Sequence, residues 1–340
     1  MALRPVSSIR KEAFTLTASQ KHLKGMSYAK YGYLFALPFI IVFLIFTLYP
    51  TVYTFVLSFT DAHGVGNEIK LLDEPLGNFS KILANQTFKT CMKNTVKLWI
   101  LNFIPQITLA MVLTAWFTAR RVTIKGQGLF KVLFYMPNII TAATIAILFN
   151  ALFQYPKSPV NEILVTIGLR DSYFNFFNNK TASQLLVAFI QFWIWYGNTM
   201  IVLISGVLGI SPDIYEAADI DGANSAQIFF RITIPNLKTV LLYTLVTSLI
   251  GGLNMFDIPK LLNRGGPDMS TSTAVVFIYD KAFTGKQLFA QAAAASIIMF
   301  IIIAICSALL FYIMRDKDAI ALEKMKKAEL KARRKGVSAL

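Results

Sequence analysis

The chain is built of long apolar segments separated by shorter polar ones. Six segments of 18 to 32 residues contain no Asp, Glu, Lys, Arg or His. They are residues 31–60, 98–119, 132–156, 181–212, 239–256 and 287–314. A helix needs about 20 mostly apolar residues to cross the hydrocarbon core of a bilayer, because each residue adds 1.5 Å. The pattern therefore predicts an all-α membrane protein with six transmembrane helices.

Six crossings place both termini on the same side of the membrane. Lys and Arg residues near helix ends are enriched on the cytoplasmic side. The side that holds the termini carries 21 of the 33 Lys and Arg residues, and the other side, with longer loops, carries 12. We therefore expect two basic cytoplasmic tails, over 1–30 and 316–340, that flank a membrane domain over 31–315.

The composition agrees with a membrane protein and narrows its chemistry. Of the 340 residues, 55% are hydrophobic and 15% are charged, whereas soluble domains carry about 25% charged residues. The net charge of +15 follows from the basic tails and loops, so it does not indicate nucleic-acid binding. The two His and two Cys residues form no ligand cluster in the sequence, so we predict neither a metal site nor a bound cofactor.

The loop after the fourth apolar segment, residues 211–236, is predicted to begin with a short helix. Ser211 can cap that helix, and Pro212 suits its first position. Gly222 permits the positive φ that ends a helix.

A second short helix is predicted to follow. Asn224 and Gln227 have the spacing of a capping box, and Pro235 is expected to stop the helix before the fifth crossing. Residues 210–238 contain four acidic and two basic side chains, on a side of the membrane that is otherwise basic. A solvated surface loop and a docking element for a basic partner both account for this pattern.

The spacing within this loop resembles the EAA motif of ABC-importer permeases. The motif runs through Glu216-Ala217-Ala218, Gly222 and Ile232 to Ile234-Pro235, with Ile where Leu is commonest before the Pro. Two further segments look like the carbohydrate branch of that family, at the first permease of the maltose and glycerol-3-phosphate transporters. These are the first crossing, with Leu37-Pro38, Tyr49-Pro50 and Leu57-Ser58-Phe59-Thr60, and the outer turn Gly265-Gly266-Pro267-Asp268.

The resemblance implies a permease subunit of a type I ABC importer in a bacterial or archaeal cell membrane. Such a subunit works with a second permease, a cytoplasmic ATPase dimer and an extracellular solute-binding protein that delivers a sugar. The chain has no phosphate-binding loop of the G-x-x-x-x-G-K-[ST] type, so ATP and Mg would be used by the partner and no catalytic residue is expected. The resemblance assigns docking to the ATPase to a coupling set of residues, with Glu216 pairing with a basic ATPase residue. This set is Tyr215, Glu216, Ala217, Ala218, Asp221, Gly222, Ala223, Phe229, Ile232 and Pro235.

Polar side chains within the crossings are candidates for the substrate pathway, because they are costly in lipid unless they face protein or water. Gln191, Trp195 and Asn198 share one face of the fourth crossing, and Tyr196 and Thr199 flank it. Amides can bind sugar hydroxyls, and an aromatic ring can stack on a sugar ring. Amides that join helices and aromatic residues of an interfacial belt are the alternative.

Two other crossings supply further pathway candidates. In the fifth, the resemblance points to Gly251, Gly252, Asn254 and Met255, with Gly252 and Met255 where the maltose relative carries amides. The fifth crossing is expected to end near Asp257, at the outer interface. In the second crossing, Asn102 and Gln106 lie on one face together with Trp99, where helix packing is the alternative.

Two other classes of protein compete with this interpretation. A stand-alone secondary transporter of a small polar solute would more often show an internal repeat or charged residues within the membrane. An intramembrane enzyme would need a catalytic constellation, such as paired carboxylates or a G-x-S-x-G motif. The sequence shows none of these features. The particular sugar stays undetermined, and a sugar phosphate or a polyol is left open.

Overall fold

The computed structural model describes residues 29–120, 124–314 and 325–330. The N-terminal tail lies almost wholly outside this range, as does the C-terminal tail apart from an exposed helical stretch at 325–330. The described residues form helices and loops, with one isolated bridge between Thr60 and Leu71.

The first apolar segment forms a unit of its own. Helix α2 (Ala29–Phe43), the π-helix η2 (Leu44–Leu48) and α3 (Tyr49–Leu57) follow one another, and residues 31–57 make a candidate membrane span. No residue of this span is buried within the chain. A helix that is apolar on every side suits the interior of a membrane.

The second unit, residues 57–340, contains the other spans. They are α5 (Gln86–Phe117), α9 (Lys180–Leu208), α13 (Lys238–Leu253) with α14 (Asp257–Asn263), and α16 (Phe289–Met314). Helix α5 begins well before residue 98, where the apolar run starts. The side chain of Asn85 caps the helix by accepting the Phe88 N–H at 3.0 Å, and three Lys residues lie within its first turns.

The third apolar segment is bent rather than straight. It forms α6 (Gln127–Ile139) and α7 (Ala142–Phe153), whose axes differ by 91°. Ile140 and Thr141 between them are extended, and the Thr141 side chain caps α7. Pro137, which lacks a backbone N–H, lies in the last turn of α6 and weakens the helix there. The described residues thus contain five candidate spans, or six when the bent pair counts as one.

Close backbone contact holds α6 against α9. A Cβ atom on Gly197 would lie 2.1 Å from the carbonyl oxygen of Phe134, so only glycine fits this crossing point. Three buried apolar clusters surround α5. One joins it to α4 (Gly77–Ala84), α13, α15 (Ala274–Phe283) and α16, another to α7, α9 and α14, and the third to α6 and α9.

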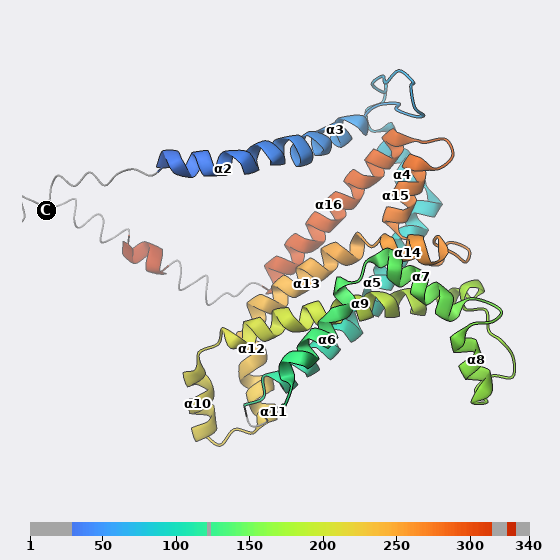
Figure 1. Cartoon of the computed structure of the whole chain (residues 1–340). Helices are drawn as coiled ribbons and strands as arrows, with labels where there is room; N and C mark the ends of the chain where they lie inside the picture. Colours follow the sequence, from blue (N-terminus) through green and yellow to red (C-terminus); the bar gives the residue numbers. More distant parts are fainter. Residues whose placement is uncertain (1–28, 121–123, 315–324, 331–340) are drawn as a thin grey trace, which may run out of the picture. The chain divides into compact units, whose positions relative to one another are not determined.

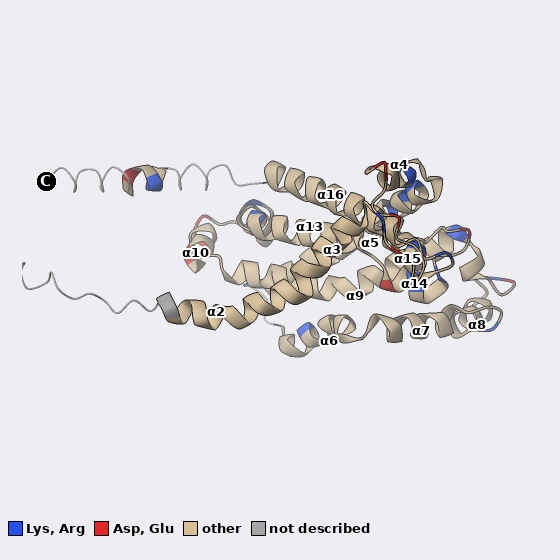
Figure 2. Ribbon diagram, turned by 90° about the horizontal axis from the view of Figure 1, so that it is seen from above, with Lys and Arg blue, Asp and Glu red and all other residues tan. Residues whose placement is uncertain are grey.

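The two ends of this helical unit differ. At one end lie α10 (Pro212–Ile220), α11 (Ser225–Gln227), the π-helix η4 (Ile228–Thr233) and α12 (Ile234–Asn236) (Figure 1). At the other end lie α4, α14, α15 and α8 (Pro159–Thr166). Figure 2 shows the Lys, Arg, Asp and Glu residues concentrated on these end elements and their loops, while the long helices between them carry few.

Candidate functional site

A polar cavity of about 320 Å³ lies among α5, α9 and α13. Small-molecule sites typically occupy about 300–1,000 Å³ and combine apolar walls with a few polar groups. The lining residues are Asn102, Gln106, Gln191, Trp195, Asn198, Thr199, Val202, Tyr243, Thr244, Thr247, Ser248, Gly251, Gly252, Asn254, Met255, Phe256 and Asp257. The cavity thus gathers ten of the eleven residues that the sequence suggested for a substrate pathway.

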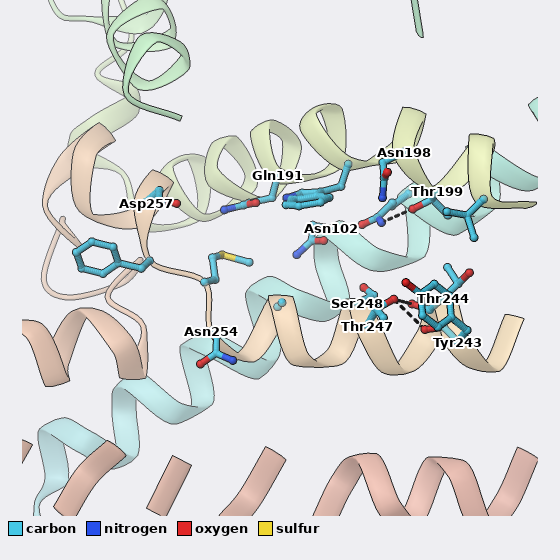
Figure 3. Close-up of a pocket in the computed structure, with 17 residues that line it drawn as sticks. Asn102, Gln191, Asn198, Thr199, Tyr243, Thr244, Thr247, Ser248, Asn254 and Asp257 are labelled. Carbon is cyan, nitrogen blue, oxygen red and sulfur yellow. Dashed lines mark hydrogen bonds between the residues drawn. The ribbon is translucent and has the colours of Figure 1, made fainter. Parts of the chain in front are cut away.

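Helix α9 supplies one wall. Gln191, Trp195, Asn198 and Thr199 recur along one helical face and line the cavity (Figure 3). Tyr196 does not. Its ring is buried between Phe134 and Phe192, with centroid distances of 6.3 and 5.6 Å. The structure thus places Tyr196 outside the cavity wall, where its ring packs α9 against α6.

Helix α5 supplies two buried amides. The Nδ2 group of Asn102 donates to the carbonyl oxygen of Leu98 at 2.9 Å. The Nε2 group of Gln106 donates to the Thr199 hydroxyl at 2.7 Å and joins α5 to α9. Both side chains border the cavity and also meet the packing role that the sequence left as the alternative.

Helix α13 supplies the opposite wall, across the cavity from Asn102 and Asn198 (Figure 3). Its two adjacent glycines serve different purposes. A Cβ atom on Gly252 would lie 2.0 Å from Trp99 Cδ1, so Gly252 makes room for that indole. The indole N–H donates to Ser248 Oγ at 3.3 Å, and Trp99 is absent from the cavity wall. Gly251 has no heavy atom within 4 Å of such a position and borders open space.

Seven lining residues were not predicted: Val202, Tyr243, Thr244, Thr247, Ser248, Phe256 and Asp257. The spacing of Tyr243, Thr247 and Asn254 repeats at four and seven residues, which marks one helical face and could have revealed the hydroxyl-bearing wall. The sequence predicts that the fifth crossing ends near Asp257, at the outer interface. Asp257 begins α14 and lines the cavity, as the one charged residue among the described lining side chains.

The predicted helix pair after α9 is present, and its caps differ from the expectation at one end. Gly222 adopts a φ of +74°, as its predicted role in ending α10 requires. Asn224 and Gln227 form the predicted capping box, with hydrogen bonds of 2.8 and 2.9 Å. Ser211 makes no cap, because its hydroxyl instead donates to the Asp213 carboxylate at 3.3 Å.

The second helix of the pair is largely the π-helix η4, which the sequence did not indicate. Pro235 does not end it. The chain stays helical to the end of α12 at Asn236, and α13 begins at Lys238 after a break at Leu237.

The predicted coupling set divides into buried and exposed members. Tyr215 and Ala218 lie on the buried face of α10. Ala223, Phe229 and Ile232 are half-buried. The remaining members, Glu216, Ala217, Asp221, Gly222 and Pro235, are exposed. The exposed members of the set on α10 and at its C-terminal end are thus acidic or small, a form suited to close contact with a basic partner.

Glu216 already has a partner within the chain. Its carboxylate lies 3.5 Å from the guanidinium of Arg120, just beyond the end of α5. The same guanidinium lies 5.7 Å from the centroid of the Tyr215 ring. The two side chains of the ion pair are 63% and 43% exposed, so the pair holds α10 only weakly.

Comparison of the sequence and of the structure with known proteins finds membrane transport proteins in each case. The profile of the "Binding-protein-dependent transport system inner membrane component" family matches residues 33–317. The lactose transport system permease protein LacF of Rhizobium radiobacter is 31% identical over 88% of this chain and 99% of its own. The arabinooligosaccharides transport system permease protein AraP of Bacillus subtilis is 29% identical over 90% of this chain and 96% of its own.

A solved structure shows the same fold. One chain of a bacterial alginate ABC transporter, crystallised in complex with an alginate pentasaccharide-bound periplasmic protein, superposes with a TM-score of 0.73 at 22% identity. The match covers 87% of this chain and 98% of that one.

Proposed function

Because the chain belongs to the family of binding-protein-dependent transport system inner membrane components, we propose that it imports a neutral sugar or oligosaccharide with energy from a separate ATPase. The chain is a multi-pass permease subunit of a cell membrane and adopts the ABC-importer permease fold.

The observation that best supports this proposal is the cavity among α5, α9 and α13. Its wall offers amides from Asn102, Gln191 and Asn198 and hydroxyls from α13, which suit the hydroxyl groups of a saccharide. The side chain of Trp195 is 46% exposed and that of Tyr243 is 60% exposed, so both rings are available for stacking on a sugar ring.

The charge of the cavity favours a neutral substrate. None of the described lining residues is Lys, Arg or His, and Asp257 contributes one carboxylate. A phosphorylated or uronic sugar would meet no opposite charge on this wall and would face repulsion from Asp257. The named substrates of the relatives LacF and AraP, lactose and arabinooligosaccharides, are of the neutral kind that such a wall suits.

The partners follow from the division of labour in this family. We assign the α10–α12 segment to the ATPase, because α10 presents Glu216, Ala217 and Asp221 outward and the chain has no phosphate loop of its own. ATP and Mg are used by that partner. A second permease completes the pathway, and an extracellular binding protein delivers the sugar. The α10–α12 end of the helical unit and the C-terminal end of α16 lie on the same side (Figure 1), which fits a cytoplasmic C-terminus.

Co-purification tests this assignment. The tagged chain is isolated from its native membrane in mild detergent, and the associated proteins are identified by mass spectrometry. We expect an ATPase and a second, different permease in stable association. A chain that is reproducibly alone, yet folded and able to transport in liposomes, would show a secondary carrier instead.

A further inference from the structure

A buried pair of hydroxyl groups links α10 to η4. The Tyr215 hydroxyl lies 3.3 Å from Thr233 Oγ1, although the two residues are 18 positions apart. Tyr215 is 8% exposed and Thr233 is 4% exposed. The hydroxyl pair therefore forms a specific contact between α10, whose other face is exposed, and η4, which leads through α12 into α13.

The number of available protons determines which of the two hydroxyl groups is the donor. Thr233 Oγ1 also lies 3.3 Å from the carbonyl oxygen of Ile228, which can only accept. A threonine hydroxyl has one proton, so Thr233 donates to Ile228 and accepts from Tyr215. Ile228 lies five residues before Thr233, so the same hydroxyl bridges the π-turn and receives Tyr215.

The surroundings make the contact selective. Both residues are buried and border a cavity of about 580 Å³, whose wall is mostly apolar, with Phe117, Val207 and Phe229, and also includes Arg120 and Asp219. In such surroundings a hydroxyl that loses its partner has few replacements, so the pair holds one geometry. The exposed ion pair between Glu216 and Arg120 has water as an alternative and does not fix α10 in the same way.

A ladder of backbone hydrogen bonds continues from Thr233 toward the polar cavity. The Leu237 N–H donates to the Thr233 carbonyl at 3.0 Å, and the Leu241 N–H donates to the Leu237 carbonyl at 2.8 Å. Helix α13 begins within this ladder and carries Tyr243 and Thr247 on the cavity wall. A displacement of Thr233 is therefore passed along the backbone to the residues that face the substrate.

We propose that the Tyr215–Thr233 hydrogen bond is the positioning contact through which movement of α10 shifts the α13 wall of the polar cavity. The inference rests on the proposed function, since an ATPase must supply the movement. Tyr215 and Thr233 act through α13 and do not touch the substrate. Coupling of this kind requires that α10 be held differently in the two states of the transporter.

Cysteine accessibility tests the inference without knowledge of the natural sugar. The complete complex, with its ATPase and second permease, carries Thr247→Cys in a background with Cys91→Ala and Cys306→Ala. The probe is the small cationic thiol reagent MTSET. Its reaction rate with the cavity cysteine is measured without nucleotide and after trapping with ATP and vanadate, and the ratio of the two rates reports the movement of the wall.

Removal of either hydroxyl is expected to diminish this ratio. A hydrogen bond of this kind changes an equilibrium by a factor of about five. Tyr215→Phe should reduce the nucleotide-dependent change in rate about fivefold. Thr233→Val, which also removes the bond to Ile228, should reduce it at least as much. The double variant should lose no more than Thr233→Val alone, because that change already removes the bond to Tyr215. Thr233→Ser keeps the hydroxyl and should restore the ratio of the parent.

Matched controls separate the contact from general effects. Tyr173→Phe removes a hydroxyl that donates to Glu162 at the other end of the unit, and Thr108→Val removes one that donates to Ile104 within α5. Neither should alter the ratio. A parent-like ratio in Tyr215→Phe and Thr233→Val, or failure of Thr233→Ser to restore it, overturns the inference. A parent complex that shows no nucleotide-dependent change overturns the proposed function and the inference with it.

Discussion

The Gln106 amide of α5 donates a 2.7 Å hydrogen bond to the Thr199 hydroxyl of α9, and both side chains are almost fully buried. The bond lies at the wall of the polar cavity, between the two helices that pack most extensively in the described structure. One residue therefore combines helix packing with a place in the cavity wall. Substitution of Gln106, compared with substitution of Gln191, distinguishes the effect of helix packing from the effect of a place in the cavity wall.

Gln106→Leu should destabilise the protein more than Gln191→Leu does. The first change leaves the buried Thr199 hydroxyl without its donor, which costs about 1–3 kcal/mol. The second removes an amide that borders the cavity and should reduce sugar uptake with a smaller loss of stability. Thermal unfolding in detergent and uptake by intact cells measure the two effects. Equal loss of stability in both variants would contradict the separation.

Gly252→Ala should impair folding, whereas Gly251→Ala should not. A methyl group on Gly252 would meet Trp99 Cδ1 at 2.0 Å, and overpacking of this kind costs about 1–3 kcal/mol. A methyl group on Gly251 enters open space at the cavity. The amount of protein in the membrane and its melting temperature distinguish the two, with the adjacent glycine as the control. Parallel behaviour of the two variants would show that Trp99 does not occupy the observed position.

Gly222→Ala should reduce coupling between the ATPase and uptake while the protein stays in the membrane. The residue has a φ of +74°, which costs an L-residue about 1–2 kcal/mol, and the strain would distort the end of α10. Gly168→Ala is the matched control, because Gly168 has a φ of +72° at the opposite end of the unit. ATP hydrolysed per sugar imported is measured for both. A rise with Gly168→Ala as large as that with Gly222→Ala would assign the effect to strain alone.

Glu216→Gln should likewise lower uptake more than it lowers the amount of protein in the membrane. The ion pair with Arg120 is exposed, so its loss costs little stability. The carboxylate is instead expected to serve the basic partner. Arg120→Gln breaks the same ion pair and keeps the carboxylate. If both variants reduce uptake equally, the internal pair, and not a partner contact, accounts for the role of Glu216.

The sequence could predict those parts of the site that lie on one regular helix. Gln191, Trp195 and Asn198 line the cavity because α9 is continuous and its periodicity holds. Tyr196 lies outside the cavity wall, because five residues from Gln191 correspond to a rotation of about 140° and point to another face of the helix. The same arithmetic explains why Tyr196 meets α6.

Other features depend on contacts that a single sequence does not display. The role of Gly252 follows from Trp99, which lies on another helix. The hydroxyls of α13 were overlooked because Thr and Ser can satisfy themselves within a helix. Thr244 and Thr247 do so by donating to the carbonyls of Val240 and Tyr243. The 91° bend of the third segment arises at two extended residues, and Pro137 before them indicates a weakened helix but not the angle or direction of the bend.

Uptake by proteoliposomes distinguishes an ATP-driven importer of neutral sugars from a secondary carrier. The complete complex, with its binding protein, is reconstituted with or without enclosed ATP, and the accumulation of radiolabelled lactose, arabinooligosaccharides and alginate oligosaccharides is compared. We expect ATP-dependent accumulation of a neutral saccharide and none of the uronic one. Accumulation of sugar by this chain alone, at the same rate without ATP or the ATPase, would contradict this expectation.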